Sequence, residues 1–165
     1  MIEYRNILFC TDFSEDANIA FLHALDLAKK YKARLHILHI PHSSYAYCRH
    51  VVDEHVPLDS PGGEAFFDEK IAEKAEEALK EKYEKRMGEF KDYIYVIKNG
   101  APDVEIIRYA KKNDIDLIVM GALGKSELDR IEHGSTVANV SKYAHCHVIA
   151  IRNPEKQFTL PGNLY

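Results

Sequence analysis

Three glycines and a serine form the pattern in this sequence with the clearest chemical meaning. Gly121 and Gly124 follow an apolar run and are separated by two residues, and nine more residues lie between Gly124 and the pair Gly134-Ser135. Glycine lets the backbone approach a ligand closely and accepts positive φ without strain. Backbone N–H groups at a helix start then point at an anion, whose charge the helix dipole favours. The set indicates a site for phosphate groups, to which Ser135 and Thr136 add hydroxyl donors.

Two other interpretations of these glycines have to be weighed. Gly121 and Gly124 also fit a surface turn, and Gly134 also fits the cap of a helix. A P-loop is excluded, although Gly124-Lys125-Ser126 has the appearance of its end. That motif requires a glycine five positions before Gly124, and position 119 is valine.

The N-terminal segment reads as a strand that ends in polar residues. The continuous apolar run in Asn6–Cys10 is typical of a parallel strand covered on both faces, and it stops at Thr11-Asp12. Ser14 is expected to cap a helix that runs to Tyr31. A second strand is expected at Leu35–Ile40, which completes a strand–helix–strand unit.

The remaining pattern alternates in the same way. Pro41–Gly63 is the least regular part of the chain. Further helices are expected at Glu64–Met87, from near Pro102 to Asn113, and at Ser135–Tyr143, and further strands at Tyr93–Ile97, Asp116–Met120 and His147–Ile151. Five strands alternating with four helices predict an α/β fold: a doubly wound five-stranded parallel sheet of order 3-2-1-4-5 with helices on both faces. We expect one domain over residues 1–152 and an irregular tail over 153–165.

That strand order brings two separately identified segments together. Ligands of doubly wound sheets bind outside the carboxyl ends of the strands where the order reverses, here strands 1 and 4. Thr11-Asp12 ends strand 1 and Gly121 ends strand 4. The Asp12 carboxylate could accept hydrogen bonds from a ribose or base or help to hold a divalent cation. Its alternative role is that of a turn residue beside Ser14.

These segments resemble the nucleotide-binding branch of the universal stress protein family. The resemblance rests on Val119-Met120-Gly121 with the glycine spacing, on residues 6–14 and on a final strand near 147–152, so that it covers roughly residues 3–152. It implies that the ligand is ATP or another adenine nucleotide (ADP or AMP), with or without Mg²⁺. The residues it assigns to base and ribose are Thr11, Asp12, Phe13, His39, Ile40, Met120 and Gly121. In this interpretation the phosphates lie on Gly124, Gly134, Ser135 and Thr136, and the protein is a nucleotide-dependent switch or sensor in the stress response.

The segment between the glycines departs from the usual basic pattern of that family. It carries Glu127, Asp129 and Glu132 against Lys125 and Arg130. Acidic groups near a triphosphate weaken binding unless they point outward or bind Mg²⁺. No residue is a convincing catalytic base, so we do not expect an enzyme. Slow ATP hydrolysis and a nucleotide-free dimeric interaction protein are the alternatives.

Composition limits the other classes of function. The 165 residues carry a net charge of −4, which gives no reason to expect nucleic-acid or membrane attraction. No apolar run approaches a membrane span, and the first residues lead directly into a strand pattern without a signal peptide. The three cysteines form no CxxC pair, which favours a reduced, cytoplasmic location.

A metal or redox site is the second hypothesis. Ligand-type residues gather over residues 36–55: His36, His39, His42, Cys48, His50 and His55. Their spacing matches no structural zinc pattern, and His36 and His39 should point to opposite faces of a strand. We therefore expect no metal site. His145-Cys146-His147 is expected to be a helix-to-strand turn with a buried thiol.

The last strand suggests how the chain assembles. In the order 3-2-1-4-5 it lies at an edge of the sheet, and its residues Val148, Ile149, Ala150 and Ile151 are apolar. Exposed apolar edges are normally paired or covered. We expect a two-fold homodimer through this edge, a contact that the family also uses.

Overall fold

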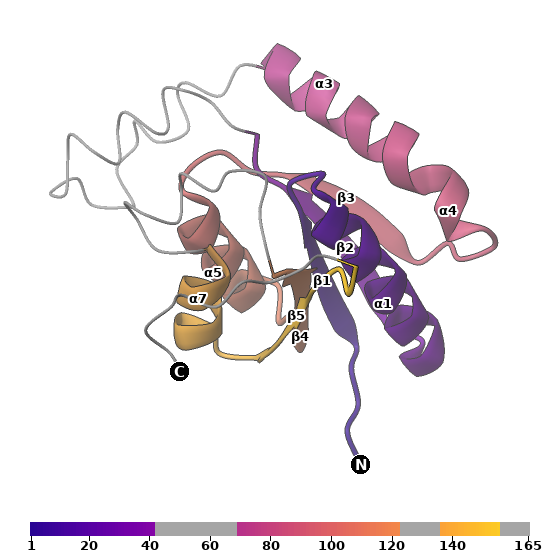
Figure 1. Cartoon of the computed structure of the whole chain (residues 1–165), viewed down its shortest axis with the longest axis vertical. Helices are drawn as coiled ribbons and strands as arrows, with labels where there is room; N and C mark the ends of the chain where they lie inside the picture. The colour runs from indigo at the N-terminus through magenta and orange to yellow at the C-terminus, as the bar shows by residue number, and fades with distance from the viewer. Residues whose placement is uncertain (42–68, 123–135, 156–165) are drawn as a thin grey trace, which may run out of the picture.

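The computed structural model describes residues 1–41, 69–122 and 136–155, and they form a single parallel sheet with helices on both faces (Figure 1). The strand order is β3-β2-β1-β4-β5, as the sequence predicts. The strands are β1 (Asn6–Thr11), β2 (Arg34–His39), β3 (Tyr93–Ile97), β4 (Leu117–Gly121) and β5 (His147–Ile151).

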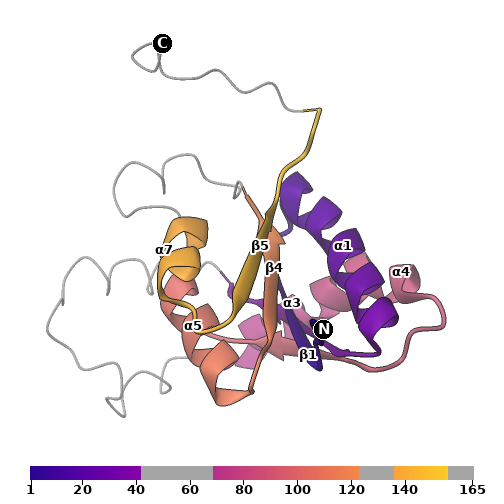
Figure 2. The same cartoon turned by 90° about the horizontal axis from the view of Figure 1, so that it is seen from below.

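The helices lie in two layers. The bounds are α1 (Glu15–Tyr31), α3 (Glu69–Leu79), η1 (Lys80–Glu84), α4 (Lys85–Met87), α5 (Pro102–Lys112) and α7 (Thr136–Tyr143). Figure 2 shows α1, α3 and α4 on one side of the sheet and α5 and α7 on the other. The predicted α/β class, strand order and two-sided helix packing are confirmed.

The core is divided by the sheet into two clusters, and β1 contributes to both. Ile7 and Phe9 pack toward α1, whereas Leu8 and Cys10 pack toward α5 and α7, and the first three of these are fully buried. Alternate side chains of a strand point to opposite faces. A strand covered on both sides must therefore be apolar throughout, which explains the uninterrupted run.

The long helix before β3 differs from the prediction. A single helix was expected over 64–87, of which 64–68 lie outside the described residues. From Glu69 onward the structure has an α-helix, then the π-helical turn η1, then the short α4. The predicted helix is confirmed from Glu69 to Met87. The π-helical turn within it was not predicted, because the apolar stripe that indicates a helix does not record one extra residue in a turn.

The first helix begins as its sequence predicts. Ser14 is the N-cap, and its Oγ accepts a hydrogen bond from the Ala17 N–H at 3.2 Å. Glu15 and Asp16 occupy the first turn, where the helix dipole favours acidic groups. Lys32 ends the helix in the left-handed conformation with φ of 55°.

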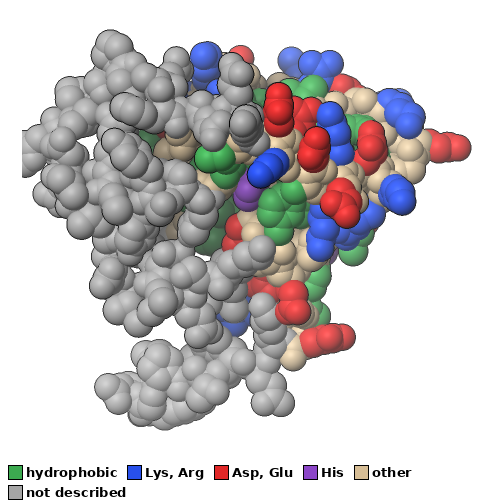
Figure 3. All heavy atoms as spheres, turned by 90° about the horizontal axis from the view of Figure 1, so that it is seen from above, with side chains coloured by type: hydrophobic (Ala, Val, Ile, Leu, Met, Phe, Trp, Pro, Cys, Tyr) green, Lys and Arg blue, Asp and Glu red, His purple; other side chains and the backbone are tan. Residues whose placement is uncertain are grey.

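The outer side of the α3 layer is polar. Glu76 and Lys80 form an ion pair at 2.6 Å, one helical turn apart. Figure 3 shows acidic and basic side chains interleaved over the described residues on that face, so neither sign forms a continuous patch. None of the described helices is long and apolar enough to span a membrane.

Candidate functional site

The carboxyl ends of β1 and β4 lie side by side at the centre of the sheet. The two strands are parallel neighbours in a register that opposes Cys10 to Met120. On the other side of β1, Thr11 opposes His39 of β2. From this centre the sheet continues to β2 and β3 in one direction and to β5 in the other, so the order reverses between β1 and β4.

The chain leaves β1 through a tight turn that its own side chains hold. The Phe13 N–H donates to Thr11 Oγ1 at 3.0 Å, and the Ser14 N–H donates to Asp12 Oδ1 at 2.9 Å. Phe13 has φ of 63°, a backbone conformation that bulky residues rarely adopt. Non-glycine residues held in this region cluster at functional sites. Asp12 thus makes the turn contact that its alternative interpretation predicts, and its carboxylate is half-buried at the strand end.

β2 supports this turn from the side. His39 Nδ1 lies 2.8 Å from the Thr11 carbonyl oxygen and must donate to it, since a carbonyl only accepts. The His39 ring also contacts the Phe13 ring, with centroids 4.5 Å apart. The next residue, Ile40, is half-buried and packs with the cluster under α5. Three of the residues predicted for the base and ribose therefore contact one another directly.

The end of β4 is packed more tightly than the sequence indicates. A Cβ on Gly121 would lie 2.8 Å from Ala17 N and 2.9 Å from Asp16 Cβ. The missing side chain of Gly121 therefore lets the first turn of α1 approach β4. Met120 is only 5% exposed, so its side chain belongs to the core.

Asp16 is a residue of this region that the sequence analysis missed. It is fully buried, and its Oδ1 accepts a hydrogen bond from the Asn153 N–H at 3.2 Å. This contact ties the chain after β5 to the start of α1. An acidic residue in a first helical turn is normally explained by the dipole alone, so the sequence held no signal for it.

The phosphate half of the predicted site is described only in part. Thr136 is half-buried and opens α7, which packs against α5 and β5. Gly124, Gly134 and Ser135 lie outside the described residues, as do the charged residues between them. The role of every predicted ligand residue stays a prediction.

Tyr83 is the second residue whose role sequence reasoning missed. It is fully buried in η1, and its hydroxyl lies 2.6 Å from Thr11 Oγ1. Burial raises the pKa of this phenol, so the group is protonated at neutral pH. A half-exposed hollow of about 350 Å³ lies beside it, lined by Phe13, Ala78, Glu81 and Lys82.

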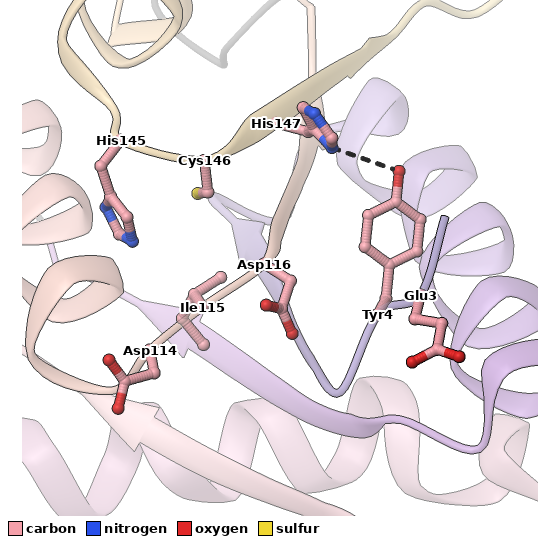
Figure 4. A pocket seen from close by; sticks show the side chains of 8 residues that line it. All are labelled: Glu3, Tyr4, Asp114, Ile115, Asp116, His145, Cys146 and His147. Atoms are coloured by element: carbon pink, nitrogen blue, oxygen red, sulfur yellow. Dashed lines mark hydrogen bonds between the residues drawn. The ribbon is translucent and has the colours of Figure 1, made fainter. Parts of the chain in front are cut away.

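A second hollow, of about 380 Å³, lies at the amino ends of β1, β4 and β5, opposite the carboxyl ends described above (Figure 4). The residues that line it are Glu3, Tyr4, Asp114, Ile115, Asp116, His145, Cys146 and His147. The Tyr4 hydroxyl lies 3.5 Å from His147 Nδ1. Asp116 Oδ2 accepts from the backbone N–H groups of Arg5 and Asn6 at 2.7 and 2.9 Å, which joins β1 to β4.

The metal hypothesis has no support in the described part of the chain. No group of three His, Cys, Asp or Glu side chains there is arranged to hold a metal ion. His36 bonds Tyr109 on the α5 face, whereas His39 bonds Thr11, so these two histidines do point apart. His42, Cys48, His50 and His55 lie outside the described residues. Cys146 lies in the turn before β5, as expected, but its side chain is half-buried and not fully buried, and this partial burial raises the pKa of its thiol.

The fold and the position of this turn define a class of protein: a doubly wound α/β domain whose candidate site lies where the strand order reverses. Comparison with known sequences makes the assignment specific. The sequence model of the universal stress protein family matches residues 3–152, and the chain belongs to this family.

Individual relatives agree with this assignment. A universal stress protein of Methanocaldococcus jannaschii is 34% identical over 155 residues, which are 93% of this chain and 85% of the relative. The structure of UspA from Lactobacillus plantarum is 29% identical, covers 92% of this chain and all of that chain, and superposes with a TM-score of 0.67. A universal stress protein of Archaeoglobus fulgidus in complex with dAMP shares the fold at 19% identity, with a TM-score of 0.57 over 92% of this chain and 99% of that one.

Proposed function

We propose that this protein binds an adenine nucleotide at the carboxyl ends of β1 and β4 and acts as a nucleotide-dependent switch or sensor in the stress response. The observation that carries the proposal is the convergence of the strained turn after β1 with the end of β4, from which the glycine motif continues. Membership of the universal stress protein family and the dAMP complex of a protein with the same fold support it.

The residues around the turn fit an adenosine. The half-buried Asp12 carboxylate offers an acceptor to ribose hydroxyls or to an adenine amino group. Phe13 and His39 form the adjoining surface, the buried Thr11 lies beneath it, and the half-buried Ile40 supplies an apolar wall. Met120 and Gly121 would contribute through their backbone, since the side chain of Met120 is buried and Gly121 has none.

The phosphates would lie on the backbone of Gly124, Gly134, Ser135 and Thr136, where N–H groups at the start of α7 favour an anion. ATP, ADP and AMP all carry the adenosine that the turn would hold. A bound Mg²⁺ would offset the acidic residues between the glycines. The proposed role is binding and signalling, with no catalytic residue assigned.

Mass spectrometry of the small molecules released from freshly purified, denatured protein tests this function. We expect an adenine nucleotide from the wild type. Gly124→Val and Gly134→Val should each abolish it while far-UV circular dichroism stays nearly unchanged, because a side chain there blocks approach to the backbone. Gly162→Val, outside the segment that matches the family, is the control and should retain the ligand. Retention of nucleotide by both motif variants would disprove the phosphate assignment.

A further inference from the structure

A π-helical turn interrupts the helix that packs on the same face of the sheet as α1. This turn contains Tyr83, the residue of that helix that reaches the candidate site. η1 spans Lys80–Glu84, and its extra residue rotates the following side chains relative to a regular α-helix. Tyr83 lies in this turn and is fully buried. It therefore cannot touch a ligand in the crevice, and any effect it has there must pass through a neighbour.

The Tyr83 hydroxyl belongs to a chain of hydrogen bonds that starts at the strained turn. The Phe13 N–H donates to Thr11 Oγ1 at 3.0 Å, and Thr11 Oγ1 lies 2.6 Å from the Tyr83 hydroxyl. Tyr83 in turn donates to Asn18 Oδ1 across a longer 3.5 Å. With the tyrosine proton directed to Asn18, the Thr11 hydroxyl donates to Tyr83 while accepting from Phe13. Bonds aligned in one direction in this way strengthen one another.

Aromatic packing fixes where that hydroxyl lies. The Tyr83 ring meets Phe9 and Phe21 with centroids 5.4 and 4.7 Å apart, and it stacks on Phe13 at 6.3 Å with planes 13° apart. The Arg86 guanidinium lies 5.7 Å from the centroid of the Tyr83 ring. Side chains of β1, of the turn after β1 and of α1 therefore hold the ring, and this packing directs its hydroxyl at Thr11.

We propose that Tyr83 is a positioning residue of the adenine-nucleotide site, which fixes the Phe13 turn through the Thr11 hydroxyl and so couples nucleotide binding to the helix formed by α3, η1 and α4. This inference rests on the proposed function. A positive φ at a phenylalanine costs free energy and persists only where neighbours hold it. The bond from Tyr83 keeps Thr11 oriented to accept the Phe13 N–H, and the helix that carries Tyr83 thereby contributes to the shape of the site.

The test is Tyr83→Phe, which keeps the ring and removes only the hydroxyl. We expect its affinity for ATP, measured by isothermal titration calorimetry, to fall about five- to tenfold, the effect of losing one buried hydrogen bond. In the ligand-free protein, hydrogen exchange at the Phe13 amide should become faster by a similar factor. Circular dichroism should show an intact fold.

Tyr109→Phe is the matched control. It also removes a buried tyrosine hydroxyl, which bonds His36 Nδ1 at 2.7 Å on the opposite face of the sheet. It should lower thermal stability to a similar extent and leave both the ATP affinity and the Phe13 exchange rate unchanged. Equal losses of ATP affinity in the two variants would reduce Tyr83 to a general stabilising residue and overturn the proposal.

Two more variants separate the bond from the packing. Thr11→Val removes the bond to Tyr83 and also the acceptor of the Phe13 N–H, so it should lose at least as much ATP affinity as Tyr83→Phe does. The double variant Thr11→Val/Tyr83→Phe should bind no worse than Thr11→Val alone, because Thr11→Val has already removed the bond between Thr11 and Tyr83. Additive losses, or wild-type affinity in Tyr83→Phe, would overturn the positioning role while leaving nucleotide binding itself intact. A wild type that binds no adenine nucleotide would instead overturn the proposed function.

Discussion

Gly121 illustrates how one residue serves packing and a proposed site together. A Cβ there would meet the backbone of Asp16 and Ala17 at 2.8–2.9 Å, and backbone atoms at the start of a packed helix move at a high cost. We expect Gly121→Ala to lower the free energy of unfolding by about 1–3 kcal/mol, measured by urea denaturation.

Gly88→Ala provides the contrast to this change. Nothing lies within 4 Å of the added Cβ, so its cost is limited to the positive φ of 60°, about 1–2 kcal/mol. A second substitution that removes a side chain near Gly121, such as Asp16→Gly, should restore part of the free energy of unfolding lost in Gly121→Ala. The same second substitution should restore none of the loss in Gly88→Ala. Wild-type stability of Gly121→Ala would contradict the close approach of α1.

His36 makes the stability depend on pH. Its ring is 5% exposed, and burial, assisted by the charge of Arg34, lowers its pKa below the usual 6.5, against the opposing effect of Asp92. The unfolded chain therefore takes up this proton at a higher pH than the folded protein does. The contribution of neutral His36 is fully present above about pH 6.5 and is lost as the pH falls toward the lowered pKa of the folded state.

We expect the free energy of unfolding to fall more steeply below pH 6.5 in the wild type than in His36→Gln. Glutamine does not titrate, and it can still pair with the Tyr109 hydroxyl that now bonds His36. Urea denaturation at a series of pH values measures both slopes. Parallel slopes would show that His36 is not the group responsible.

The candidate site depends most on the first turn of α1. Ser14 caps it, Asp16 ties it to Asn153, and Gly121 packs against its first turn. Ser14→Ala removes the acceptor for the Ala17 N–H and should cost about 1 kcal/mol, seen as a lower midpoint of urea denaturation. Ser14→Asp supplies another capping oxygen and should restore most of this stability, and an equal loss in both variants would argue against the cap.

The strands and helices show which sequence signals are sufficient to predict an element and its bounds. β3 and β5 have the predicted bounds, and β1, β2 and β4 differ by one residue at one or both ends. Each strand is a short apolar run between polar or turn residues, and this signal places its ends to within one residue. The π-helical turn could not be predicted, since Tyr83 fits the stripe of a regular helix. The bonds of Asp16 and Tyr83 join residues more than sixty positions apart, and only the folded chain brings them together.

Topological rules predict the fold of the whole molecule more completely than they predict its candidate site. The alternation of strands and helices, with right-handed crossovers, predicted the strand order, and that order predicted the meeting of Thr11 with the end of β4. The candidate site is harder to assess from the sequence. Asp12 also has a role in the turn, and the predicted roles of Gly124, Gly134 and Ser135 are untested because these residues lie outside the described ones. The division into a domain of residues 1–152 and a tail of 153–165 stays a prediction, as does a cytoplasmic location.

We also propose a homodimer through β5, an edge strand of the sheet. Val148, Ile149 and Ile151 are half-buried and Ala150 is exposed, so within the described residues an apolar edge remains available to a second copy. Ala150→Arg places a charge on this edge and should convert a dimer to a monomer in size-exclusion chromatography with light scattering. Ser141→Arg, on an exposed position of α7, is the control. A monomeric wild type would contradict the proposal.

The most direct test of the account is an NMR titration of the ¹⁵N-labelled protein with ATP and, in a separate sample, with AMP. We expect the amide signals that shift to cluster at Thr11–Ser14, His39–Ile40, Gly121 and the start of α7. With AMP the shifts should be the same around Thr11–Ser14 and smaller at α7, because the phosphate chain is shorter. Shifts confined to the hollow around Tyr4 and His147 at the amino ends of the strands, or no shifts at millimolar nucleotide, would contradict nucleotide binding at the carboxyl ends of β1 and β4.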